Sequence, residues 1–233
     1  MTEERKLALG DVDRDGALLE AIAALHGETR AEFLRRAALG SAAMLAVLAA
    51  PASAATTAQT DIDILNFGLR FERLQASFYT EADSTGTVGR MVARKQQWAR
   101  TLGAHERAHV RIIKKILGDR AGPRPFFDFQ GLTETDDGFT RTAVAMEDLT
   151  VALLSGIAPR VEDRGLVAAL FGLLTTEARH AAWARNIVNT TPSAHAFDEP
   201  RSLDDVGRLI ARTHFVASTP RVSRGGRNPR MTG

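Results

Sequence analysis

The sequence predicts an all-α protein: a four-helix bundle with one long crossover between the second and third helices. Three observations lead to this prediction. Apolar residues recur at helical spacing in four segments, and no stretch of appreciable length shows the alternation of a strand. Each segment has a Glu at or beside its apolar side. In two of them a His follows three residues after the Glu, which places both side chains on the same side of the helix.

The first helix is expected to begin at Asp61, an acidic residue suited to capping and to the positive N-terminal end of the helix dipole. Its apolar residues step by three and four, at Ile64, Phe67, Phe71, Leu74 and Phe78. Glu72 falls beside this stripe. Tyr79 lies seven residues farther on and therefore almost directly above Glu72.

The second helix is expected from about Val88 to Leu117, ending at Gly118. It has many charged residues, but an inward face is supplied by Leu102, Ala108, Ile112, Ile113 and Ile116. Glu106 and His109 lie along this helix.

A connection of about twenty residues should follow, because residues 118–138 contain Pro123, Pro125 and the sequence Asp136-Asp-Gly138. A connection of this length can cross the whole bundle. The third helix is expected from about Phe139 to Ala158, with Pro159 at its exit. It carries Glu147, whereas Asp148 points about 100° away from Glu147 and is assigned to the surface or to a supporting role.

The fourth helix is expected from about Arg164 to Asn189 and carries Glu177 and His180. Trp183 lies one turn beyond His180, where it could wall the cluster from solvent, although core packing is the more common role of such a residue. A short terminal helix is expected over 202–212.

The four segments together contain the set of residues used by two-metal carboxylate bundles, namely one Glu on each of two helices and Glu-x-x-His on each of the other two. The predicted metal ligands are Glu72, Glu106, His109, Glu147, Glu177 and His180. The first three would hold one ion and the last three the other, with Glu106 and Glu177 as the bridges. Since the chain has no Cys, all ligands are oxygen or nitrogen, which suits iron, manganese or zinc; two iron ions, or two manganese ions, are expected.

The chain has 233 residues and a formal charge of +2, enough for one domain with tails and too little charge to indicate a nucleic-acid partner. The expected partners are metal ions, and a homodimer is left open. The expected organisation is an export signal over 1–54, a linker over 55–60, the bundle over 61–190, and a C-terminal extension and tail over 191–233.

The N-terminus has the features of an export signal. An uncharged run of fourteen residues, Ala37 to Ala50, follows Arg35-Arg36 and is too short to cross a bilayer as a helix. Small residues in Pro51-Ala-Ser-Ala54 predict cleavage after Ala54, hence a protein of the periplasm, cell envelope or exterior with no stable transmembrane span in its mature chain. Thr29-Arg-Ala-Glu-Phe-Leu-Arg35 resembles a twin-arginine signal, except that Ala31 replaces the second arginine. The alternative is an extra helix over 16–50.

Four segments carry a family resemblance: Asp61-Ile-Asp-Ile-Leu-Asn-Phe, Glu106-Arg-Ala-His109-Val, Met146-Glu147-Asp148 and Thr176-Glu-Ala-Arg-His180-Ala-Ala-Trp183. Over residues 57–215 the chain resembles the exported bacterial ferritin-like domain family, which includes plant desiccation-related proteins. The resemblance implies a ferritin-like four-helix fold, a dinuclear iron or manganese centre, and a segment after His195 that folds back on the bundle. The chain departs from the family pattern around Gln75, since relatives often have a second acid near this position.

The resemblance implies no single reaction. Oxidation of ferrous iron, peroxide disposal and chemistry like that of manganese catalase are the candidates, and an enzyme of this kind would be a di-iron or di-manganese oxidoreductase. A non-catalytic envelope stress-binding bundle is a further alternative, although four buried Glu without metal would carry a large desolvation cost.

The sharpest rival interpretation uses the same residues. His105-Glu106-Arg-Ala-His109 is a complete His-Glu-x-x-His sequence, the zinc-binding signature of metalloproteases. No Gly-x-x-His continuation follows, and a protease would leave Glu72, Glu177 and His180 unexplained. His105 is therefore assigned to the surface or to a supporting role, and the three remaining histidines, His26, His195 and His214, are expected at the surface.

Overall fold

The computed structural model of this protein describes residues 58–218. The predicted export signal over 1–54, its cleavage after Ala54, residues 55–57 of the linker, His26 and the last fifteen residues lie outside this range. The export prediction is therefore not tested by the fold.

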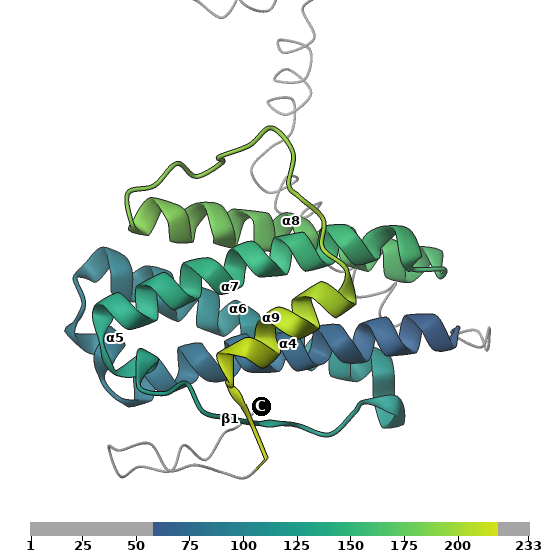
Figure 1. Ribbon diagram of the computed structural model, residues 1–233, viewed down its shortest axis with the longest axis horizontal. Coiled ribbons are helices and arrows are strands. Elements are labelled where there is room, and N and C mark those ends of the chain that lie inside the picture. The colour runs from purple at the N-terminus through teal and green to yellow at the C-terminus, as the bar shows by residue number, and fades with distance from the viewer. Residues whose placement is uncertain (1–57, 219–233) are drawn as a thin grey trace, which may run out of the picture. The chain divides into compact units, whose positions relative to one another are not determined.

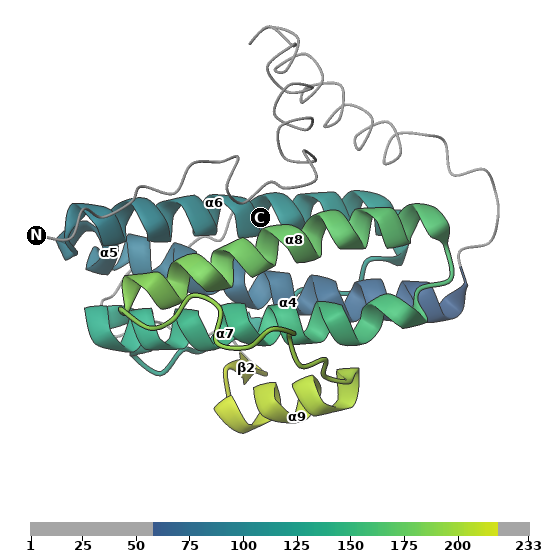
Figure 2. The same ribbon diagram turned by 90° about the horizontal axis from the view of Figure 1, so that it is seen from above.

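Four long helices lie side by side and form the bundle (Figures 1 and 2): α4 (Gln59–Ser84), α6 (Ala93–Leu117), α7 (Asp136–Ile157) and α8 (Arg164–Ile187). The shorter elements are α5 (Thr87–Arg90), α9 (Leu203–Thr213) and three 3-10 turns at Gly118–Arg120, Leu132–Glu134 and Ala158–Arg160. Two antiparallel strands of two residues each, β1 (Phe126–Phe127) and β2 (Val216–Ala217), are the only sheet among the described residues.

The long connection between α6 and α7 runs along the bundle, so that α4 packs against α6 and α7 packs against α8 (Figure 1). The prediction of an all-α four-helix bundle with one crossover between the second and third helices is confirmed.

The first helix begins at Gln59, two residues earlier than expected, and Asp61 is not its cap. Asp61 is instead 1% exposed, and its two carboxylate oxygens accept hydrogen bonds from the backbone N–H groups of Glu162 and Asp163, at 2.9 and 3.0 Å. This carboxylate fixes the connection between α7 and α8 against the start of α4. The long sequence separation of these groups explains why local rules assign Asp61 to a different role.

The predicted second helix is broken into α5 and α6 by extended backbone at Met91 and Val92. The break turns the Met91 side chain into the core, where it is 5% exposed. Gln96 stabilises it, because its side-chain amide donates to the carbonyls of Gly89 and Met91, at 3.2 and 2.7 Å. In α6, Ile112 was expected to face inward but is 38% exposed, whereas the adjacent Ile113 is buried.

The third helix begins at Asp136, within the Asp-Asp-Gly sequence that was expected to exclude helix. Thr135 caps it by accepting a hydrogen bond from the backbone N–H of Gly138, at 3.1 Å, and two acids occupy the first turn, where the helix dipole favours them. The fourth helix is capped in the same way by Asp163 and ends at Ile187, two residues before the predicted end.

An aromatic cluster closes one part of the core. Phe78 stacks on Phe139 with ring centroids 5.1 Å apart, and Tyr79 and Trp98 meet the same Phe139 ring edge to face. Phe78, Trp98 and Phe139 are fully buried, so Tyr79 is held between rings that cannot readily move.

Among the described residues, one helical stretch, Asp136–Arg160, is long and apolar enough to cross a membrane by length and composition alone. It comprises α7 and the turn after it, and it packs as a central helix of the bundle. Core helices commonly satisfy the same criteria, so this finding is weak evidence for a membrane span.

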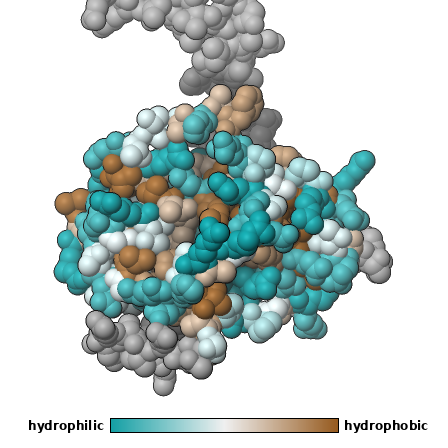
Figure 3. Space-filling view, in the orientation of Figure 1, coloured by the Kyte–Doolittle hydropathy of each residue, from teal (hydrophilic) through white to brown (hydrophobic). Residues whose placement is uncertain are grey.

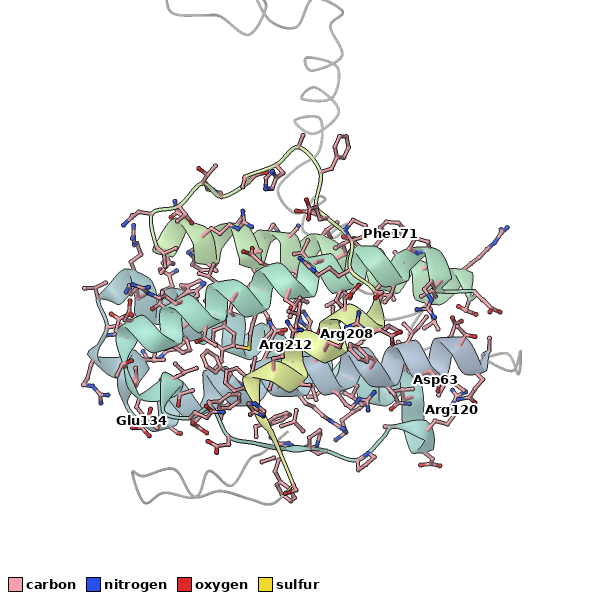
Figure 4. The ribbon with its side chains drawn as sticks, viewed as in Figure 1. Asp63, Arg120, Glu134, Phe171, Arg208 and Arg212 are labelled. Atoms are coloured by element: carbon pink, nitrogen blue, oxygen red, sulfur yellow. The ribbon has the colours of Figure 1, made fainter. Side chains whose placement is uncertain are left out.

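The segment after α8 folds back on the bundle, as the family resemblance implied. The backbone N–H of Arg201 donates to the carbonyl of Ala152 on α7, at 2.9 Å, and α9 then lies on the outside of α7 (Figure 2). Val206 is the buried residue of α9, whereas Arg208 and Arg212 lie on its exposed side (Figure 4). In the same orientation, apolar surface is scattered among polar residues rather than gathered in one large patch (Figure 3).

Gly156 on α7 is where this returning segment comes closest. A Cβ atom there would lie 2.0 Å from the carbonyl oxygen of Arg201, which is backbone and cannot swing away. We therefore expect Gly156→Ala to lower the free energy of unfolding by about 1–3 kcal/mol, measured by urea denaturation, because the segment must shift. Gly68→Ala is the matched control in α4: its Cβ would meet nothing within 4 Å, so this variant should gain about 0.5–1 kcal/mol. Equal stability of the two variants would contradict the prediction.

Candidate metal centre

The structure brings all six predicted ligand residues into one buried cluster at the centre of the bundle. Each helix contributes the residues that periodicity placed on its inner side: Glu72 from α4, Glu106 and His109 from α6, Glu147 from α7, and Glu177 and His180 from α8. The four Glu side chains are at most 2% exposed. Helical spacing of three residues is what turns each Glu and its His toward the same point.

The ligand atoms form two overlapping groups, each able to hold one metal ion. One group is Glu72, Glu106, His109 and Glu177, and the other is Glu106, Glu147, Glu177 and His180; within each, the candidate atoms all lie within 4.8 Å of one another. Glu106 and Glu177, the residues assigned as bridges from the sequence, occur in both groups. The first group contains Glu177 in addition to the three ligands predicted for it, and the second contains Glu106, because a shared carboxylate faces both positions.

The His109 ring turns its Nδ1 atom into the cluster. This atom lies 3.0 Å from Glu177 Oε1, 3.3 Å from Glu72 Oε2 and 3.5 Å from Glu106 Oε2, so three helices place an oxygen around one nitrogen. None of these contacts is a well-directed hydrogen bond. Such a convergence of oxygen and nitrogen lone pairs on one point is the arrangement that a cation requires.

The His180 ring also turns Nδ1 inward, 3.2 Å from Glu106 Oε1 and 3.3 Å from Glu177 Oε2. Its other ring nitrogen, Nε2, points away from the carboxylates and lies 2.9 Å from Nδ1 of His105. The two rings are nearly parallel, with an interplanar angle of 19° and centroids 5.1 Å apart. His105 thus contacts a ligand residue without being in either ligand group.

Burial and mutual proximity shift the pKa values of the acids in opposite directions. Burial, followed by the charge of Glu106, raises the pKa values of Glu72 and Glu147 well above the usual range. Burial alone would also raise the pKa of Glu106, but the adjacent His109 and His180 rings outweigh it and lower that pKa to about 2.

The imidazoles respond to the same carboxylates. Burial alone would lower the pKa of His180, yet Glu106 and Glu177 raise it to about 9, and the surrounding acids raise the pKa of His109 further. His105 behaves differently: burial and then the charges of His180 and His109 lower its pKa. Without metal, the cluster therefore holds extra protons on acids and on imidazoles.

Unpaired polar atoms are concentrated in this cluster. Among the described residues, eight buried side-chain nitrogen and oxygen atoms have no hydrogen-bond partner, and six of them belong to it: Glu72 Oε2, both oxygens of Glu106, His109 Nδ1, Glu147 Oε2 and Glu177 Oε1. Since folded proteins rarely leave buried polar atoms unpaired, these six atoms fit a bound cation.

Tyr79 supports the cluster from α4. Its hydroxyl donates a hydrogen bond to Glu147 Oε1 at 2.5 Å, and burial followed by the nearby carboxylates raises its pKa well above the usual range. The sequence placed Tyr79 above Glu72 on one helix, but its partner lies across the bundle on α7. Helical spacing alone could not have identified that partner.

Gln75, which the family resemblance singled out because relatives often have a second acid near it, is completely buried. The Thr150 hydroxyl lies 2.7 Å from Gln75 Oε1 and 2.9 Å from the carbonyl of Met146, and it has one hydrogen to share between them. The Gln75 Nε2 group has no partner among the described residues. A neutral amide therefore stands beside the acidic cluster where an additional acid would have added to the repulsion.

The remaining residues singled out from the sequence take the expected supporting or surface places. Trp183 is partly buried and packs against the main apolar core, which is the core role expected for it. Asp148 points away from the cluster and pairs with Arg185 at 2.8 Å. His195 and His214 are exposed.

Known proteins resemble the chain over its four-helix region. A family model described as a ferritin-like domain matches residues 60–190, which covers all four bundle helices apart from the first residue of α4. No curated protein sequence matches the chain.

Proposed function

The chain belongs to the ferritin-like domain family, and from this premise we propose that its buried cluster is a dinuclear iron or manganese centre with oxidoreductase activity. The observation that supports this proposal most strongly is the pair of overlapping ligand groups, which share Glu106 and Glu177 and draw on four separate helices.

The energetic argument favours occupancy. Four carboxylates that are at most 2% exposed repel one another in a region of low dielectric, and each loses its hydration. The metal-free chain reduces this cost by keeping protons on Glu72 and Glu147, whose pKa values are raised. Two divalent cations would neutralise the same charges and also supply partners for the six unpaired atoms.

The donor set also indicates which metals fit. Carboxylate oxygens and imidazole nitrogens, with no thiolate in the chain, suit iron, manganese or zinc, and of these only iron and manganese readily change oxidation state. A bound pair of such ions would supply the electron-transfer chemistry needed to oxidise ferrous iron or to dispose of peroxide. The protein itself excludes water from the cluster and holds the Glu147 carboxylate by the Tyr79 hydroxyl.

The metalloprotease alternative is not favoured. A His-Glu-x-x-His protease site would need His105 and His109 as ligands of one zinc ion. Neither ligand group among the described residues contains His105, whose Nδ1 faces His180 instead. Glu106, which would have to act on a water molecule, is completely buried between the two imidazoles.

We further propose that the protein acts outside the cytoplasm, in the periplasm, the cell envelope or the exterior. The support is the uncharged run from Ala37 to Ala50 that follows Arg35-Arg36 and precedes the small residues before Ala54. The N-terminal residue of the protein recovered from its native host tests this: a start at Ala55 is expected, and a chain that retains Met1 would oppose it.

The proposed centre is tested by counting metals. The full chain, purified without chelators or metal-affinity steps, should carry about two iron or manganese ions per chain by elemental analysis, or should take them up on reconstitution. A Glu177→Ala, His180→Ala double variant should take up neither, while keeping its helical circular dichroism. No uptake by the wild-type chain would favour a non-catalytic bundle, and one zinc ion retained by the variant would favour a site built on His105 and His109.

A further inference from the structure

We propose that His105 is a positioning residue of the metal centre: it accepts a hydrogen bond from His180 and thereby holds the His180 ring with Nδ1 directed at one of the two metal positions. This inference rests on the proposed function, since a positioning role presupposes a ligand to be positioned. It gives a role to His105, the one residue of the His-Glu-x-x-His signature that neither ligand group contains.

The geometry carries the proposal. His105 Nδ1 lies 2.9 Å from His180 Nε2, within ordinary hydrogen-bond distance, and the rings lie nearly parallel at an interplanar angle of 19°. His105 precedes Glu106 by one residue, so its side chain is turned by about 100° from that of Glu106. This rotation carries it out of the carboxylate cluster and toward α8, where its ring meets that of His180.

The direction of the hydrogen bond follows from imidazole chemistry. A neutral imidazole has one N–H, and a nitrogen that binds a metal must not be the protonated one. His180 presents Nδ1 to Glu106 and Glu177 and to the metal position beside them, so with a metal bound at Nδ1 its one remaining proton is on Nε2. Nδ1 of His105 is the acceptor that this proton requires, and hydrogen bonding of this kind fixes both the tautomer and the orientation of a metal-binding His.

The other half of the centre provides an internal comparison. His109 also presents Nδ1 to the carboxylates, but no hydrogen bond to its Nε2 is found in the part of the chain that the structure describes. The two metal positions share Glu106 and Glu177. They differ in whether the outer nitrogen, Nε2, of their imidazole has a hydrogen-bond partner. Loss of His105 should therefore weaken the binding of one ion and leave the affinity for the other nearly unchanged.

Three variants of the full chain test this role. In Co²⁺ titrations of the metal-free protein, followed by absorption, His105→Ala should weaken one of the two binding steps about 10–100-fold, the range usual for loss of an outer partner of a metal-binding His. His105→Asn can place its amide oxygen near the position of Nδ1 and should restore most of the affinity. His105→Gln places its amide nearer the position of Nε2 and should not restore it. Equal affinities for the Ala and Asn variants would overturn the proposal.

A second-site comparison assigns the effect to His180. The cost of His105→Ala should disappear in a His180→Ala background, because the ring to be held is absent, and should persist in a His109→Ala background. The same cost in both backgrounds would mean that His105 acts through general stability, and the positioning role would be wrong.

A measurement on the metal-free chain separates this inference from the proposed function. Two-bond ¹H–¹⁵N correlations of the ring nitrogens should show His105 with an unprotonated Nδ1 and His180 with a protonated Nε2. A protonated His105 Nδ1 would overturn the proposal whether or not metal binds. If the expected tautomers are found but the wild-type chain binds no Co²⁺, iron or manganese, the metal centre fails while the hydrogen bond stands, and His105 then has no ligand to position. If two ions bind and His105→Ala leaves both affinities unchanged, the centre stands and the positioning role fails.

Discussion

A Glu177→Ala variant should lose both metal ions, whereas a Glu147→Ala variant should keep one. Glu177 belongs to both ligand groups, and Glu147 belongs only to the group that contains His180. Removing a shared carboxylate takes one ligand from each ion and also removes the negative charge between the two positions. Removing Glu147 leaves the group of Glu72, Glu106, His109 and Glu177 intact.

The measurement is a titration of the metal-free protein with Mn²⁺, read as ions per chain and as two dissociation constants. For Glu147→Ala, one constant should rise by more than about 100-fold, beyond the cost of losing an outer partner, and the other should change little. Glu72→Ala should give the converse result: affinity should fall at the position that contains His109 and change little at the other.

The matched control is Asp148→Ala. Asp148 is adjacent to Glu147 in sequence and also carboxylic, but it pairs with Arg185 on the outer side of α7 and lies outside both ligand groups. This variant should bind two ions. Retention of one ion at wild-type affinity by Glu177→Ala would show that the two positions do not share this residue, and the dinuclear arrangement would be wrong.

The candidate ligands could be predicted from the sequence because helix periodicity is a local property. A spacing of three residues fixes the relative direction of Glu106 and His109 whatever the rest of the protein does. Once four apolar helices are recognised, burial of their apolar sides brings the Glu residues together. The fold class and the membership of the cluster therefore follow from short-range rules.

The supporting contacts could not be predicted in the same way. The bond from Tyr79 to Glu147 and the contact of His105 with His180 depend on how α4, α6, α7 and α8 are rotated about their axes, which no single segment specifies. Asp61 shows the same limit: its type and position suit a helix cap, but its partners are backbone groups about a hundred residues away.

Local rules also missed two helix boundaries. The break at Met91 and Val92 contains neither Pro nor Gly, and it is stabilised by burial of Met91 and by the Gln96 side chain. Conversely, the Asp136-Asp-Gly138 sequence has the composition of a turn but forms the first turn of α7, because Thr135 caps it. In both places a side-chain hydrogen bond to the backbone decides the boundary.

The metal-free protein should lose stability as the pH rises from about 5.5 to 8.5. The pKa values of Glu72 and Glu147 are raised above the usual 4.5, and that of His180 is raised from 6.5 to about 9, so the folded chain holds protons that the unfolded chain releases. The stability contributed by such groups is present below the unfolded pKa and is lost as the pH rises toward the folded one. Each proton held only by the folded state lowers the free energy of unfolding by about 1.4 kcal/mol per pH unit. Glu106 affects the pH dependence in the opposite direction, because its pKa is lowered to about 2. The stability that it contributes is lost only below pH 4.5 and does not change in this window.

Bound metal should reverse this trend, because the ions require the same lone pairs that the protons occupy. At low pH, binding must displace protons from Glu72, Glu147 and both imidazoles, and at high pH fewer remain to be displaced. The increase in melting temperature on adding excess Mn²⁺ should therefore be small at pH 5.5 and largest at pH 8.5, measured by calorimetry after chelator treatment. A Glu177→Ala, His180→Ala variant should show no metal-dependent increase at either pH. A metal-free chain that becomes more stable toward pH 8.5, or a metal effect that is greatest at pH 5.5, would mean that the cluster does not hold these protons, and the electrostatic basis for metal binding there would have to be abandoned.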